Sequence, residues 1–439
     1  MAEIRPFRAW RYNPEKVHDI NLKFSPLFDV VRPEQLEQLY AIPNNSIHLS
    51  VPRSHEEAQT KLNAWKKEKV IRLDPIPGIY VYYQQFSLFG QRKGYTRKGF
   101  ICMINPRKEN IILHENTLIH SVNDRIALLE KTKLNVSPTH GLYQDASFEL
   151  EAIMDRYMEH PLYEYIDYQG VINKLAIIQD PKDIGPFLEK IAEQPVYLAD
   201  GHHRLESSRV FSQKRQENGE AHNPQSWENF HMMYLTNMAA DDLRILPIHR
   251  VYKPAEKLDI PILREQLQQY FDLEDVSRSR KPLFDLLKGQ KHAFGLVTLG
   301  RRWIMRLKMS PWEALGEADL PDVLKQLDYT LLHMLVFDRI LGIPYEDQPH
   351  SQEIMYEKGY SNAVKDVNTS QAACSFIMNE VSVEQMLEVC STGYKMPQKS
   401  TYFYPKVVSG LVFASIDDHE IKSSFDSRFS VTEKSPNTP

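Results

Sequence analysis

The sequence predicts an α+β protein whose strands form mixed sheets. Short apolar runs rich in Val, Ile, Tyr and Phe alternate with helical segments, and no internal repeat is present. The aromatic stretch Ile79–Phe86 and the run Thr96–Ile104 flank a glycine-containing basic turn, as the two strands of an antiparallel hairpin do. Further along, within 195–215, a short apolar strand passes through a glycine turn directly into a helix.

Length and composition are those of an ordinary globular chain. The 439 residues suggest two or three domains, and the apolar fraction of 42% and charged fraction of 25% are typical of globular proteins. A net charge of −5 argues against nucleic acid or a membrane surface as a partner. No secretory signal or bilayer-spanning run is visible, and Cys102, Cys374 and Cys390 form no pair motif. We therefore expect a cytoplasmic protein without disulfides.

Four regions are expected along the chain. They are an N-terminal α+β region (1–160), a core with the strand–turn–helix element (161–255), a C-terminal α+β region (256–422) and a disordered tail (423–439).

Within these regions, three local patterns predict specific elements. Ser54-His-Glu-Glu57 is a capping-box pattern that begins a helix reaching about Lys67. The basic residues of the aromatic hairpin are expected to lie mostly at a sheet edge. Leu320–Leu341 has the apolar spacing of one long amphipathic helix, and Gly342 is a suitable residue to end it.

The strongest candidate for a functional site is Pro195-Val-Tyr-Leu-Ala-Asp-Gly-His-His-Arg204. A strand, a glycine turn and a helix start together offer free backbone N–H groups and the positive end of a helix dipole, which suit an anion. Asp200 can accept a proton or hold a metal, His202 and His203 can donate to an oxyanion, and Arg204 can clamp a phosphate. The structural alternative has equal weight, because Asp-Gly is a common turn and Asp200 can simply cap the helix.

Three further segments carry candidate side chains. The loop Gly393–Lys406 combines lysines, hydroxyls and aromatics, which favours contact with a phosphate or nucleotide over a purely structural loop. His249-Arg250 ends an apolar strand, and an edge cap is an equally good interpretation. His114-Glu115 could be a buried polar pair near a site, but a loop residue and its cap is the favoured interpretation.

A set of motifs runs through nearly the whole chain. They are Phe7-Arg-Ala-Trp-Arg-Tyr12, Ser25-Pro-Leu-Phe-Asp-Val30, His114-Glu-Asn-Thr117, Asn135-Val-Ser-Pro138, Ala199-Asp-Gly-His-His-Arg204, Leu246-Pro-Ile-His-Arg250 and Met396-Pro-Gln-Lys-Ser-Thr-Tyr-Phe-Tyr-Pro-Lys406. In these motifs and their order, the chain resembles the bacterial and archaeal family catalogued as DUF1015, and the last motif is long and specific. The sequence departs from the family pattern at Leu27-Phe28, where Pro-Tyr is more typical, but keeps Asp29.

The Asp200-Gly-His-His-Arg204 element also resembles that of free serine kinases with the ParB/sulfiredoxin-like fold. This resemblance implies a nucleotide-binding core of that fold and transfer of a phosphoryl group from ATP or ADP, with Mg²⁺, to a small hydroxy amino acid such as free L-serine. The partners implied are the amino acid, the nucleotide and a second copy of the chain in a homodimer. The residues implied as catalytic are Asp200, His202, His203, Arg204 and Asp29, with Asp200 as base or Mg²⁺ ligand and Asp29 and Glu115 as rivals. The residues implied in nucleotide binding are Gly201, His114, Glu115, Arg125, Lys399, Ser400, Thr401 and Lys406. His249 and Arg250 would hold the amino acid's carboxylate.

Two other interpretations remain. Relatives in the superfamily use bound nucleotide as a conformational switch for partner binding, and the same motif would then produce no phosphorylated small molecule. A metal site from His202, His203 and His114 is disfavoured, because adjacent histidines rarely point at one ion.

Overall fold

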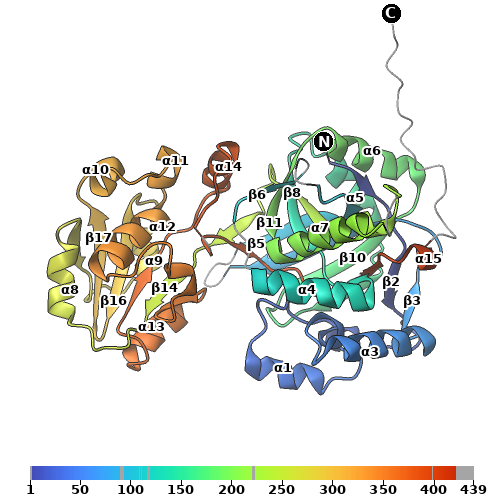
Figure 1. Cartoon of the computed structure of the whole chain (residues 1–439), viewed down its shortest axis with the longest axis horizontal. Coiled ribbons are helices and arrows are strands. Elements are labelled where there is room, and N and C mark those ends of the chain that lie inside the picture. The colour runs from blue at the N-terminus through green and yellow to red at the C-terminus, as the bar shows by residue number, and fades with distance from the viewer. Residues whose placement is uncertain are drawn as a thin grey trace, which may run out of the picture. The chain divides into compact units, whose positions relative to one another are not determined.

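The computed structural model describes residues 2–88, 93–107, 109, 111–115, 119–219, 223–397 and 399–421. They form two compact units (Figure 1). Unit 1 comprises the described residues within 1–113, 117–243 and 405–439, and unit 2 those within 114–116 and 244–404. The second unit is thus inserted into the first. The predicted tail 423–439 lies outside the described residues.

Unit 1 is built on a nine-stranded mixed sheet, which confirms the predicted class. Its strand order is β6-β11-β8-β12-β5-β4-β10-β9, and β1 pairs with β5. The pairs β11–β6 and β12–β8 are parallel, and the hairpin β4–β5 is antiparallel as expected. The strands are β1 (Ile4–Arg5), β4 (Ile79–Ser87), β5 (Gly94–Ile104), β6 (Ile111–Leu113), β8 (Thr139–Tyr143), β9 (Tyr163–Ile166), β10 (Ile172–Ile178), β11 (Val196–Asp200) and β12 (His231–Asn237).

Helices cover both faces of this sheet, so alternate residues of its inner strands belong to different cores. Tyr80 and Tyr82 of β4 pack in one cluster with residues of α3 and α4, and Ile79 and Val81 pack in another with residues of α5 and α6. The helices of unit 1 are η1 (Ile20–Leu22), α1 (Pro33–Tyr40), α2 (Ile47–Ser50), α3 (His55–Lys67), α4 (Ile119–Thr132), α5 (Glu149–Met158), α6 (Pro181–Ala192), α7 (His202–Glu217), η2 (Trp227–Asn229) and α15 (Asp418–Ile421).

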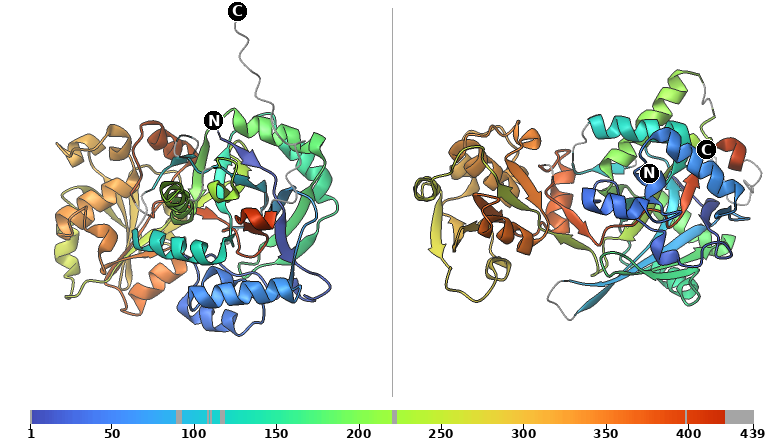
Figure 2. Two further views of the ribbon diagram at one scale, coloured as in Figure 1. Left: turned by 45° about the vertical axis from the view of Figure 1, so that its right-hand side comes forward. Right: turned by 90° about the horizontal axis from the view of Figure 1, so that it is seen from below.

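A second, small sheet brings the C-terminal segment to the N-terminal one. Its order is β3 (Ile71–Leu73), β2 (Ala9–Tyr12), β21 (Phe413–Ser415) and β7 (Leu134–Asn135). Beside it, the indole N–H of Trp10 donates to Glu420 of α15 at 3.1 Å. Figure 2 shows α15 in red beside the dark blue N-terminal strands. Unit 1 therefore needs residues after 404 to complete its structure.

Unit 2 holds a six-stranded antiparallel sheet and a two-stranded ribbon. The sheet order is β15 (Phe271–Asp275), β17 (Arg301–Leu307), β16 (Ala293–Thr298), β19 (Cys374–Ile377), β14 (His249–Tyr252) and β18 (Ile354–Glu357), and the ribbon pairs β13 (Arg244–Leu246) with β20 (Tyr402–Tyr404). The helices are α8 (Ile260–Leu267), α9 (Leu283–Leu287), α10 (Pro311–Leu315), α11 (Asp322–Lys325), α12 (Asp328–Leu331), η3 (Leu332–Ile340), η4 (Gln348–His350), α13 (Tyr360–Asn368) and α14 (Val383–Ser391).

The prediction of one long helix over 320–341 is wrong. Leu327 is extended, with φ −76° and ψ 129°, so α11 ends before it and α12 begins after it. From Leu332 the helix widens into the π form, η3. Gly342 has a positive φ of 71° and follows the last turn, as expected of a residue that ends a helix. No helix in the described ranges has both the length and the apolar character needed to cross a membrane.

Candidate functional site

The predicted strand–glycine–helix element is present in unit 1, with Gly201 between β11 and α7. Gly201 has a φ of +94°, and a Cβ there would lie 2.6 Å from Cγ2 of Thr139 and 2.9 Å from Nη2 of Arg204. Only glycine therefore fits this turn without displacing its neighbours. Helix α7 begins directly after Gly201, so the positive end of its dipole lies beside Asp200.

Asp200 is paired with two cations. The ammonium of Lys406 contacts Oδ1, and Arg204 Nη2 lies 3.1 Å from Oδ2. All three side chains are at most 13% exposed. Burial raises the pKa of Asp200, but the charges of Lys406 and Arg204 outweigh burial and hold that pKa well below its usual range. The carboxylate therefore stays ionised, and it is a poor proton acceptor.

Arg204 joins this ion-pair cluster to a pocket. Its Nη1 donates to the carbonyl of Pro138 at 2.5 Å and to Oγ of Ser137 at 3.2 Å. Ser137 and Arg204 both line the pocket, which holds about 490 Å³ of unfilled space, part of it open to solvent. A single side chain thus contacts both the Asp200 carboxylate and the pocket wall.

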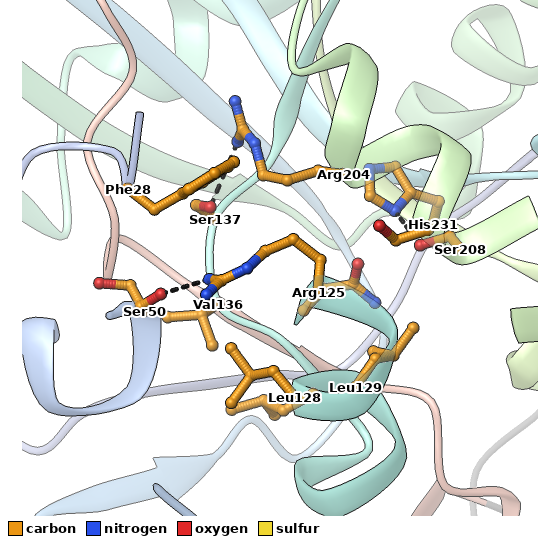
Figure 3. Close-up of a pocket in the computed structure, with 13 residues that line it drawn as sticks. Phe28, Ser50, Arg125, Leu128, Leu129, Val136, Ser137, Arg204, Ser208 and His231 are labelled. Atoms are coloured by element: carbon orange, nitrogen blue, oxygen red, sulfur yellow. Dashed lines mark hydrogen bonds between the residues drawn. The ribbon is translucent and has the colours of Figure 1, made fainter. Parts of the chain in front are cut away.

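The pocket is apolar on one side and cationic on the other. In Figure 3 the side chains of Arg125 and Arg204 extend across it, and Leu128 and Leu129 lie along its lower side. The Arg125 guanidinium lies 4.7 Å from the ring centre of Phe28 and donates to the Ser50 carbonyl at 2.6 Å. The lining residues are Phe28, Ser50, Arg125, Leu128, Leu129, Leu134, Asn135, Val136, Ser137, Arg204, Ser207, Ser208 and His231.

Two buried histidines near these groups are neutral. Burial, with Arg204 and Arg209 nearby, lowers the pKa of His231 to about 3, and its ring is hydrogen-bonded to Ser208 at 2.7 Å and to Thr139 at 3.1 Å. Burial lowers the pKa of His140 well below its usual value, and the charge of Arg97 is the next cause. Neither ring adds a positive charge at neutral pH.

Arg97 is a buried cation in the electrostatic surroundings of His140 that sequence reasoning missed. The expectation that the hairpin's basic residues lie at a sheet edge is wrong for Arg97, because β5 is an inner strand between β12 and β4 and the side chain is fully buried. Its Nη2 donates to Oε1 of Gln84 and to the carbonyl of Pro405. The sequence does contain a signal for this burial. Strand alternation places Arg97 on the same face as Ile101 and Met103, which are both core residues.

Three other predicted catalytic residues of unit 1, His202, His203 and Asp29, are not among the residues that line the pocket. His202 is buried and His203 half-buried at the start of α7. Asp29 is exposed in a turn and is not among the pocket's lining residues, whereas its neighbour Phe28 is.

Five of the predicted nucleotide-binding residues belong to unit 2: His114, Glu115, Lys399, Ser400 and Thr401. His114 Nε2 is hydrogen-bonded to the Thr401 hydroxyl at 2.9 Å, and that hydroxyl lies 3.4 Å from the Glu115 carboxylate. Lys399 has a positive φ of 55°, and its ammonium lies 4.8 Å from the ring centre of Tyr356. The Ser400 hydroxyl donates to the Pro397 carbonyl at 2.7 Å, so it supports the shape of the loop.

His249 and Arg250 are both buried in β14 of unit 2. Arg250 donates through Nε to His333 at 2.9 Å and through Nη2 to the Lys399 carbonyl at 3.2 Å. Burial, with Arg250 nearby, lowers the pKa of His249 to about 4, and His249 Nδ1 accepts from the Met378 N–H at 3.2 Å. These contacts indicate a structural role, and contact with a substrate carboxylate stays a prediction.

The carboxylate expected to bind Mg²⁺ does not suit it. Mg²⁺ in nucleotide sites is held by one or two carboxylates together with phosphate oxygens. The Asp200 carboxylate is already occupied by Lys406 and Arg204. Within the described ranges, no group of three or more His, Cys, Asp or Glu side chains is arranged to hold a metal.

The comparisons with known proteins give a family and distant structural likenesses. Residues 4–330 match a family model described as "Protein of unknown function (DUF1015)". The chain is similar to a free serine kinase in complex with AMP at 12% identity and a TM-score of 0.38, over 74% of this chain and 93% of that one. It is also similar to a conserved hypothetical protein from Pyrococcus furiosus (12% identity, TM-score 0.35, 73% and 96% covered). A third similar structure is C-terminally truncated SbnI from Staphylococcus aureus (10% identity, TM-score 0.34, 69% and 82% covered).

No curated protein matches the chain. The three structural likenesses have TM-scores of 0.38 or lower, so we base the function on this chain's own residues.

Proposed function

The chain belongs to the DUF1015 family, and on that premise we propose that it is a nucleotide-dependent phosphotransferase. The donor is ATP or ADP, and the acceptor is the hydroxyl of a small amino acid, in the first place free L-serine. The observation that carries this proposal is the position of Arg204. Its guanidinium contacts the Asp200 carboxylate at the start of α7 and also Ser137 in the pocket wall.

The lining of the pocket has the chemistry of a nucleotide site. The leucines of α4 and the Phe28 ring offer apolar surface to a nucleoside, and Arg125 and Arg204 offer charge to its phosphates. The Gly201 turn and the positive end of the α7 dipole add a site that favours an anion.

Phosphoryl transfer depends on positioning and charge neutralisation more than on covalent chemistry of the protein. In the proposed reaction the acceptor oxygen bonds to the terminal phosphorus, the bond to the bridging oxygen breaks, and the nucleotide leaves with one phosphate fewer. Lys406 and Arg204 neutralise the negative charge of the transferring group. Mg²⁺ belongs to this proposal as a partner of the nucleotide phosphates.

Asp200 has a different role from the one first expected. A carboxylate held ionised by two cations accepts a proton poorly, so we assign Asp200 to orienting Lys406 and Arg204. Glu115 and Asp29 stay the predicted alternatives for the base that takes the hydroxyl proton. Replacing Glu115 with Gln and Asp29 with Asn separates them, since loss of turnover with nucleotide affinity retained identifies the base.

Phosphorus NMR tests the proposal directly. Purified protein is mixed with Mg²⁺, free L-serine and either ATP or ADP, beside the variants Lys406→Met, His202→Ala and Asp200→Asn. Lys98→Met is the control, because Lys98 is paired at the surface with Asp155 at 2.7 Å. We expect an O-phosphoserine resonance with wild type and the control and a loss with the other three.

The other outcomes are equally informative. Nucleotide binding or hydrolysis without phosphoserine would replace the kinase by a switch protein or by an enzyme with another acceptor. If wild type bound neither nucleotide, the anion-site interpretation of α7 and Arg204 would be wrong.

A further inference from the structure

Arg97 is a buried cation without a buried anion as its hydrogen-bond partner. Its side chain is fully buried in an inner strand, and both acceptors of Nη2 are neutral oxygens, of Gln84 and Pro405. In the described part of the chain, Nε and Nη1 have no hydrogen-bond partner. Burying a guanidinium in this way is costly, and such a cost is typical of a residue with a function.

Gln84 and Arg97 together hold two consecutive backbone carbonyls. Gln84 lies on β4 and is also fully buried. Its Nε2 donates to the carbonyl of Lys406 at 3.2 Å, while Arg97 donates to the carbonyl of Pro405. Because Gln84 also accepts from Arg97, the two side chains and the two carbonyls form one connected group. The backbone at Lys406 is therefore attached to the centre of the nine-stranded sheet.

The side chain of Lys406 extends from this attached backbone to Asp200. The Lys406 side chain is 7% exposed, and its ammonium pairs with a carboxylate that Arg204 also contacts. Arg97 belongs to the same electrostatic neighbourhood, since it and Lys406 both lower the pKa of His140. The position of the ammonium thus depends on the carbonyl contacts of Arg97 and Gln84 as well as on Asp200.

We propose that Arg97 is a positioning residue that acts through Gln84 and the Pro405–Lys406 backbone to hold the Lys406 ammonium at Asp200. The ligand that benefits is the phosphate chain of the nucleotide, and this part rests on the proposed function. Arg97 itself touches no reacting group. Its loss moves Lys406 and weakens phosphate binding without removing any group that contacts the nucleotide.

Amine labelling measures the position of Lys406 without any activity. The intact protein is treated with acetic anhydride, and acetylation of each lysine is followed by peptide mass spectrometry. We expect slow labelling of Lys406 in wild type and a rate about tenfold higher in Arg97→Met, as for residues coupled through direct contacts. Arg97→Lys should lie between them, because an ammonium cannot reproduce the fork of the guanidinium.

The matched control is Lys98→Met, one residue away on the same strand, which should leave Lys406 protected. Arg97→Met can fail to fold, so Gln84→Met provides the second variant. It removes the hydrogen bond to the Lys406 carbonyl without changing a charge, and it should also raise labelling of Lys406. If Lys406 stays protected in the folded Gln84 variant, and in the Arg97 variant where that folds, the proposal is wrong.

Nucleotide affinity supplies a readout that general destabilisation does not mimic. In a double-mutant cycle measured by calorimetry, Arg97→Met and Lys406→Met should each weaken binding by about tenfold, and the double variant should be no weaker than Lys406→Met alone. Additive losses would overturn the coupling to Lys406. If wild type binds no nucleotide, the proposed function fails, and the labelling experiment still decides whether Arg97 positions Lys406.

Discussion

The ammonium of Lys406 and the carboxylate of Asp200 form an ion pair between residues 206 positions apart in the chain. Asp200 ends β11 beside the glycine turn, and Lys406 is the second residue of the segment that returns to unit 1 after residue 404. The strand–turn–helix element and the long C-terminal motif, recognised separately in the sequence, therefore meet at one contact.

Replacing Asp200 with Asn should destabilise unit 1. The amide leaves Lys406 and Arg204 largely buried without a carboxylate, and breaking a buried pair in this way costs about 3 kcal/mol of unfolding free energy. Urea unfolding at neutral pH measures the loss. Asp275→Asn is the control, because its pair with Arg301 is at the surface and should contribute little to stability. Equal losses in the two variants would contradict the prediction.

The cost of Asp200→Asn should depend on pH. The pKa of Asp200 is lower in the folded than in the unfolded protein, where it is near the ordinary 3.8. A lowered carboxyl pKa contributes stability that is present above the unfolded value and is lost as the pH falls toward the folded one. The difference between wild type and variant should therefore be constant above about pH 5 and shrink below about pH 4. A difference that grows on acidification would show that the pair is absent.

His231 should make the protein less stable in mild acid. Burial lowers its pKa to about 3 from 6.5, so between these values the unfolded chain binds a proton that the folded one excludes. Stability then rises with pH, by up to about 1.4 kcal/mol per pH unit for one proton. His231→Gln should reduce this slope between pH 4 and pH 6, measured by urea unfolding at several pH values. His160→Gln, at an exposed position, should leave the slope unchanged.

Gly201→Ala should cost more than another glycine substitution at positive φ. Gly300 has a φ of +72° and nothing within 4 Å of a Cβ, so Gly300→Ala measures backbone strain alone, about 1 kcal/mol. At Gly201 the new methyl also meets Thr139 and Arg204. We expect a loss of about 3 kcal/mol in unfolding free energy and weaker nucleotide binding. Equal losses at the two sites would show that the turn relaxes without disturbing Arg204.

Arg250→Met should destabilise unit 2 by about 3 kcal/mol. The change leaves the carbonyls of Lys399 and Ile248 and the ring of His333 without their buried donor, and each unsatisfied group costs about 1–3 kcal/mol before relaxation. Arg301→Met, at a side chain 63% exposed, is the control and should be nearly neutral. Thermal unfolding checks both. A neutral Arg250 variant would reopen the substrate role for this residue.

Local signals were sufficient for the element that carries the site. An apolar run, Asp-Gly and a breaker-free stretch predicted a strand, a turn and a helix over 195–215, and the structure has β11, Gly201 and α7 there. These signals depend on neighbours a few residues apart, which the sequence displays directly.

Contacts between distant segments could not be predicted in the same way. The helix expected over 320–341 is interrupted at Leu327, and Asp328 bonds instead to His292 through contacts of 3.0 and 3.1 Å. Nothing in the apolar spacing of 320–341 indicates that partner. The burial of Arg97 likewise depends on which strands flank β5. The pairing of Lys406 with Asp200 needed the fold, although both residues were already candidates.

The insertion of unit 2 into unit 1 has a consequence for biosynthesis. Residues 244–404 leave the ribosome before Lys406 and before β21, the strand between β2 and β7. A nascent chain that ends at residue 404 therefore contains Asp200, Gly201 and Arg204 but not the lysine that pairs with them. Domains generally fold as units during synthesis. Unit 2 can therefore finish folding before the last segment of unit 1 has been synthesised. The ion pair between Lys406 and Asp200 can therefore form only in chains whose translation has passed residue 406.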